Sequence, residues 1–92
     1  MPISELRERF EYAPELEGSC LRRLSSHRAD RVGKMAGTNS ASRYWLVQIG
    51  PKMFKAHRIV WALVKGEWPK HRLDHKDQDS YNNKIENLRE CP

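Results

Sequence analysis

The chain has 92 residues, of which 38% are hydrophobic and 32% are charged, and its formal net charge at pH 7 is +5. This length is enough for one domain and excludes a multidomain protein, and the apolar fraction excludes a disordered chain. No apolar run reaches the roughly 20 residues of a membrane span, and the N-terminus lacks a signal-peptide core, so we expect a cytoplasmic protein.

Residues 3–12 are predicted to form a short N-terminal helix. Ser4 is a suitable N-cap, and Leu6 and Phe10 are spaced to lie on one helix face. Pro14 and Gly18 then interrupt the pattern. The helix is therefore expected to be brief and amphipathic.

Residues 19–58 are predicted to form a three-stranded antiparallel sheet with a basic loop. "CLRRLSS" can form an edge strand, and "HRADRVGKMAGTNSAS" is a polar connection that contains two glycines. "RYWLVQIG" alternates in the manner of a strand, and Gly50 and Pro51 make the turn to the returning strand "MFKAHR".

Residues 57–67 are predicted to form a helix that packs on this sheet. Ile59, Val60, Leu63 and Val64 lie on neighbouring turns, and Gly66 suits the helix end. The remainder, "RLDHKDQDSYNNKIENLRECP" (residues 72–92), is predicted to form a strand, a polar loop and a second strand, or a loop ordered by Asx turns. The expected fold class is α+β, with residues 1–92 as a single domain.

The charge is distributed unevenly along this order of elements. Residues 1–20 carry a net −3 (two Arg, five Glu), residues 21–72 a net +10 (twelve Lys or Arg, two acids), and residues 73–92 a net −2. A basic middle of this density is typical of proteins that bind nucleic acid. A merely solvated basic surface is the alternative.

The stretch "FKAHRIVWALVKGEWPKHRLDHKDQDSYNNKIENLRE" resembles the phage and prophage HNH endonucleases, including homing-type enzymes that pair an AP2-like DNA-binding sheet with an HNH module. The upstream "AGTNSASRYWLVQI" also fits that family's sheet, although Arg43 stands where the family often has Gly. The resemblance implies an AP2-like sheet packed on one helix, followed by a partial ββα-metal hairpin.

The resemblance also implies roles for three residues. Asp74 would be a metal ligand, His75 the general base that takes a proton from water, and Asn87 the residue that holds the imidazole. Adjacent strand residues point to opposite sides, so presenting both Asp74 and His75 to one site requires a strand end or a bulge. Mg²⁺ or another divalent cation would be needed only if nuclease activity is retained, and binding would need no cofactor.

The family continues with a helix that supplies a last ligand, whereas this sequence closes at Pro92. We therefore expect a C-terminally truncated and catalytically inactive derivative that binds nucleic acid or a host nucleoprotein, plausibly as an inhibitor of a defence complex such as CRISPR–Cas. An active metal-dependent nickase, in which Asp77 or Asp79 replaces the ligand, and a structural or regulatory phage protein are the alternatives. Neither a membrane nor a small-molecule substrate is expected. The residues predicted to contact nucleic acid or a partner are Arg22, Arg23, Arg28, Arg31, Lys34, Arg43, Lys52, Lys55 and Arg58.

Overall fold

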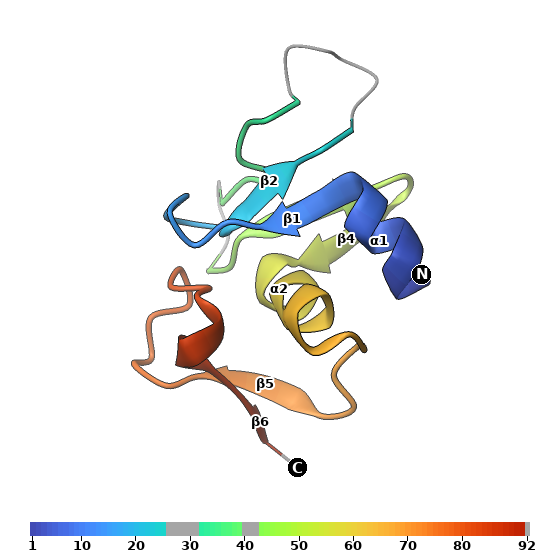
Figure 1. Ribbon diagram of the computed structural model, residues 1–92. Coiled ribbons are helices and arrows are strands. Elements are labelled where there is room, and N and C mark those ends of the chain that lie inside the picture. Colours follow the sequence, from blue (N-terminus) through green and yellow to red (C-terminus); the bar gives the residue numbers. More distant parts are fainter. Residues whose placement is uncertain (26–31, 40–42, 92) are drawn as a thin grey trace.

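The computed structural model describes residues 1–25, 32–39 and 43–91 and has an α+β fold (Figure 1). In chain order the elements are α1 (Ile3–Arg9), β1 (Phe10–Tyr12), β2 (Leu21–Arg23), β3 (Leu46–Ile49), β4 (Lys52–Lys55), α2 (Ala56–Lys65), β5 (Arg72–His75), the 3-10 helix η2 (Ile85–Asn87) and β6 (Leu88–Cys91). In Figure 1 the helix α2 lies between the β1–β2 pair and the hairpin made by β5 and β6.

The N-terminal helix is shorter than the predicted 3–12, because its last three residues form the strand β1. Phe10, Glu11 and Tyr12 pair antiparallel with β2, and Glu11 stands opposite Arg22. This pairing buries Phe10 to 3% exposure and sets opposite charges across the strands. The cross-strand contacts therefore override the helical spacing of Leu6 and Phe10.

In the described part of the chain the strands form three antiparallel pairs, β1 with β2, β3 with β4 and β5 with β6, whereas the sequence predicts a three-stranded sheet. The strand β2 pairs with β1 on one edge. On its other edge it exchanges backbone hydrogen bonds with residues 33–36, for example from Ala36 N to Leu21 O at 2.9 Å. Both edges of β2 are thus occupied, so it does not pair with β3, which pairs with β4.

The helix α2 supplies the centre of the core. Its buried residues, which include Ile59, Val60 and Leu63, form one apolar face that packs against β1, β4 and η2. Gly66 ends the helix with φ of 79°, a left-handed conformation that favours glycine. Neither this helix nor any other in the described ranges is long and apolar enough to cross a bilayer.

The strands β5 and β6 are joined by a polar loop, residues 76–84, that Asn87 ties together. The Oδ1 atom of Asn87 accepts from Asp77 N at 3.1 Å, and its Nδ2 atom donates to Asp77 Oδ1 and Asn82 O, both at 2.9 Å. The backbone carbonyl of Asn87 accepts from Lys76 N at 2.8 Å. The side chain and the backbone carbonyl of this one buried residue thus hold together the two ends of the loop that follows β5.

Candidate functional site

His75 is the last residue of β5, and a hydrogen bond fixes the orientation of its buried ring. Its Nε2 atom lies 3.1 Å from Asn83 Oδ1, and Asn83 Nδ2 donates to Gly18 O at 2.7 Å. A carbonyl oxygen only accepts, so the Gly18 contact places the NH₂ group of Asn83 there and turns its oxygen toward His75. An amide oxygen also only accepts, so Nε2 of His75 carries a proton, and in the neutral form of the ring Nδ1 is the atom with the lone pair that a general base needs.

His57, from the first turn of α2, packs against His75. The two ring centroids lie 4.8 Å apart in an edge-on arrangement, and Tyr44 lies 5.7 Å from His57 and 6.4 Å from His75. Burial, together with the charge that His75 carries when protonated and the charges of Lys55 and Arg58, lowers the pKa of His57 to about 3. His57 is therefore a neutral ring at pH 7 that forms one wall of the site.

These rings line a cavity of about 450 Å³ that also carries three cationic side chains, Lys55, Arg58 and Arg72. We call it the cationic cavity. Lys55 Nζ lies 4.5 Å from the centre of the Tyr44 ring, where the ring face attracts a positive charge. The cations come from the end of β4, the start of α2 and the start of β5, so the junction of these elements gathers positive charge beside His75.

Among the residues that the structure describes, Asp74 is the one acid that lines the cationic cavity, and it has an ion-pair partner. Its Oδ2 atom accepts from Arg89 Nε at 3.2 Å and from Arg89 Nη2 at 2.9 Å. Asp74 and His75 both line the cavity. They are the last two residues of β5, and adjacent side chains can face one site at the end of a strand. An exposed pair of this kind is weak, so other ligands can compete for either partner.

A divalent cation would find few ligands in the described residues. They contain no group of three or more His, Cys, Asp or Glu side chains arranged to hold a metal ion. Asp77 does not join Asp74, because its carboxylate accepts from Asn82, Asn87 and the backbone of Asp79. Those hydrogen bonds also lower the pKa of Asp77, the bond from Asn82 most of all. Asp74 alone does not make a metal site, and a cation there would take most of its ligands from phosphate and water.

The ring of His75 is held by Asn83 and not by Asn87, to which the sequence assigns that role. The hydrogen bonds of Asn87 go to the loop, as described above, whereas Asn83 is 1% exposed and bonds His75 directly. The sequence offers the motif "NNKIEN", with three asparagines within six residues. Which of the three asparagines bonds His75 depends on the carbonyl of Gly18, which orients Asn83 and lies 65 positions away in the chain.

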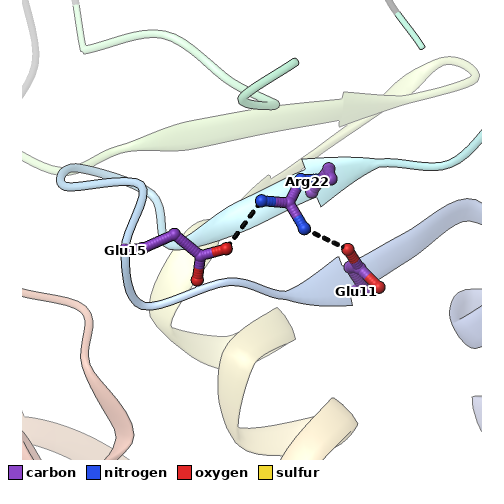
Figure 2. A network of polar contacts seen from close by, with 3 residues as sticks. All are labelled: Glu11, Glu15 and Arg22. Carbon is purple, nitrogen blue, oxygen red and sulfur yellow. Dashed lines mark hydrogen bonds and ion pairs between the residues drawn. The ribbon is translucent and has the colours of Figure 1, made fainter. Parts of the chain in front are cut away.

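Arg22 and Arg23, which were predicted to bind nucleic acid or a partner, are engaged within the chain and do not line the cationic cavity. Arg22 donates to Glu11 Oε1 and, at 2.6 Å, to Glu15 Oε2 (Figure 2). These two carboxylates raise the pKa of Arg22 further and neutralise its charge locally. The guanidinium of Arg23 lies 5.6 Å from the centre of the Phe10 ring.

The other predicted cations divide into three groups. Lys55 and Arg58 lie together in the cationic cavity, where they are joined by Arg72, which the sequence analysis missed. Arg72 could have been found from its place two residues before Asp74 on one strand. Exposed positions that do not line this cavity are Lys34, Arg43 and Lys52. Positions that lie outside the described residues are Arg28 and Arg31.

Residues 54–92 match the protein family described as HNH endonuclease. The match begins in β4, includes α2 and the β5–β6 hairpin, and therefore contains His57, Asp74, His75 and Asn83. Comparisons with curated proteins and with solved structures gave no match. This part of the chain is thus similar to an HNH endonuclease domain, a similarity that suggests a function related to nucleic acid. The AP2-like character of the upstream strands and the phage origin stay predictions.

Proposed function

We propose that the protein binds nucleic acid at the cationic cavity, with a backbone phosphate held among Lys55, Arg58 and Arg72. One observation carries this proposal. Three cations line the same cavity as His75, and the single acid that lines it in the described part of the chain, Asp74, is already paired with Arg89. Phosphate contacts from Lys and Arg supply most of the affinity in sequence-independent binding. The match of this part of the chain to an HNH endonuclease supports the same class of ligand.

The face around β1 and β2 is a poorer candidate for the phosphate. Glu11 and Glu15 bond Arg22 there and would repel a polyanion (Figure 2). The cationic cavity, by contrast, is lined by the rings of Tyr44 and His57 as well as by the cations, so ring atoms take the place of water on part of its wall. Partial exclusion of water strengthens an ionic contact.

Charge reversal at the cavity tests the binding proposal. The double variant Lys55→Glu/Arg58→Glu and the control Lys65→Glu/Lys70→Glu change the net charge equally, but only the first pair lines the cavity. Fluorescence anisotropy with a labelled single strand at about 50 mM salt should show at least a tenfold loss for the cavity variant beyond that of the control. Equal losses in the two variants would contradict the proposal. EDTA should leave the affinity of the wild-type protein unchanged.

Metal-dependent cleavage of nucleic acid is the second candidate, and the tautomer of His75 favours it. A ring with its proton on Nε2 and a lone pair on Nδ1 is in the form that removes a proton from water. Plasmid nicking in Mg²⁺ or Mn²⁺ that disappears in His75→Ala would establish this activity. Nicking that survives in His75→Ala would come from a contaminating nuclease.

The expected target, a host nucleoprotein such as a CRISPR–Cas effector, rests on size, charge and resemblance alone and stays a prediction. Such a complex would present its nucleic-acid phosphates to the same cationic cavity. A pull-down from host lysate, with and without nuclease treatment, checks it. Capture that resists nuclease treatment would point to protein contacts instead.

A further inference from the structure

We propose that a second cavity binds an unpaired nucleobase next to the phosphate held in the cationic cavity. The inference rests on the proposed function and adds the part of the nucleotide that the cations do not contact. The second cavity has a volume of about 480 Å³, and its lining includes Trp45, Tyr81, Asn83 and Gly18. We call it the aromatic cavity.

The two cavities are neighbours, separated by a thin wall. Asn83 lines the aromatic cavity and His75 lines the cationic cavity, and their side chains are hydrogen-bonded at 3.1 Å. The loop between β5 and η2 forms the rest of the wall. Along it Gln78 and Ser80 line the cationic cavity, whereas Asp79 and Tyr81 line the aromatic cavity. Adjacent binding sites of this kind match the arrangement of a phosphate and the base of the same or the next nucleotide.

The side chains of the aromatic cavity suit a base. Trp45 and Tyr81 offer ring surfaces on which a nucleobase can stack, and Tyr81 is 41% exposed. Gly18 allows the Trp45 ring to lie against the backbone, since a Cβ atom there would come within 2.7 Å of that ring. Burial raises the pKa of Cys20, so its thiol adds no charge to the wall.

The charges of the aromatic cavity exclude a phosphate and select among bases. Of the described residues, Glu17 and Asp79 both line it, against one cation, Lys84. Two carboxylates repel a phosphate, but they accept hydrogen bonds from an exocyclic amino group such as N4 of cytosine. The ligand class is therefore a base with an amino group, so cytosine is preferred over thymine, which has none.

The base must also be unpaired. A base inside a duplex is stacked on its neighbours and paired along its polar edge, so it cannot enter a cavity lined by amides and carboxylates. Single-stranded nucleic acid, or a duplex with one extruded base, is therefore the form of substrate that fits both cavities.

Three ligands and two variants test the nucleobase cavity. The ligands are a labelled oligo-dC strand, the matching oligo-dT strand, and oligo-dC with one abasic site placed at each position in turn. The variants are Tyr81→Ala, which removes the ring, and Tyr81→Phe, which keeps it. Because base–aromatic stacking is worth about 1–3 kcal/mol, Tyr81→Ala should weaken oligo-dC binding by roughly 5- to 100-fold, and Tyr81→Phe by less than about twofold.

The outcomes separate this inference from the proposed function. Loss of affinity at one abasic position together with loss in Tyr81→Ala supports it, and wild-type affinity in both experiments overturns it. Equal binding of oligo-dC and oligo-dT overturns the role given to the carboxylates. If the protein binds only the phosphate, only the Lys55→Glu/Arg58→Glu variant should lose affinity for the strand. That result would contradict binding of a base in the aromatic cavity and leave the proposed function intact. Thermal unfolding of both Tyr81 variants, measured alongside, checks that each is folded at the temperature of the binding experiment.

Discussion

His57 is a buried imidazole whose protonation opposes folding. Its pKa in the folded chain is about 3, because burial disfavours the charged form and because His75, Lys55 and Arg58 are close. In the unfolded chain the pKa returns to the model-peptide value near 6.5. The unfolded state thus binds a proton in the window between these values that the folded state does not bind.

The free energy of unfolding should therefore decrease as the pH falls from about 6.5 toward 3, by up to about 1.4 kcal/mol for each pH unit. Urea unfolding at pH 7 and pH 5 measures this slope. The variant His57→Phe keeps a ring in the site and should lose more than half of the slope in that interval. An unchanged slope in His57→Phe would mean that other groups cause the acid sensitivity.

Asn83 fixes the tautomer of His75 and also bonds the backbone of Gly18. In Asn83→Ala the buried Nε2–H group and the Gly18 carbonyl lose their partner, which should cost about 1–3 kcal/mol of stability. Nitrogen-15 NMR of the imidazole should show the Nε2–H form in the wild-type protein and a mixture of both tautomers in the variant. Asn82→Ala is the control, since Asn82 does not bond His75, and it should leave these ring signals unchanged.

The end of α2 is an element whose geometry depends on one residue. Gly66 adopts φ of 79°, and a Cβ atom there would meet only Arg7 Nη2 at an ordinary 3.8 Å. The Gly66→Ala variant should therefore lose stability through backbone strain alone, by about 1–2 kcal/mol. Thermal unfolding measures the loss. Lys65→Ala, one residue earlier in the helical region, should change the stability by less than about 0.5 kcal/mol.

Elements fixed by local sequence could be predicted, and those fixed by distant partners could not. The periodicity of Ile59, Val60 and Leu63, with Gly66 after them, is enough to place α2 within two residues. The strand β1 was missed because its pairing with β2 depends on contacts across the intervening turn. The predicted three-stranded sheet is not confirmed in the described residues, since residues 33–36 occupy the second edge of β2.

The residues of the candidate site also divide into those that adjacent sequence identifies and those that depend on distant partners. Asp74 and His75 are adjacent in the sequence and could be singled out together, and both line one cavity. The choice of Asn83 over Asn87 required the position of Gly18. Counting positive charges also overstated the binding surface, because the count could not tell that Glu11 and Glu15 hold Arg22 (Figure 2).

At the scale of the whole molecule, the net charge of +5 is less informative than its distribution. If Lys55, Arg58 and Arg72 neutralise the phosphate in the cationic cavity and its two neighbours along the strand, about three in all, the plot of log K against log salt for a single strand should have a slope near −2. The Arg72→Ala variant should make that slope shallower by about 0.7. Arg22→Ala should leave it unchanged, because the charge of Arg22 is already paired with two carboxylates.

The most direct test of the account is to map where a nucleic acid touches the protein. Amide and side-chain NMR signals can be followed during titration with a short oligo-dC strand at about 50 mM salt. If nucleic acid binds at the two cavities, the largest shifts will fall on the residues around them, namely Tyr44, Lys55, His57, Arg58, Arg72, His75 and Tyr81. Shifts confined to α1, β1 and β2, with the signals of His57 and His75 unmoved, would contradict it.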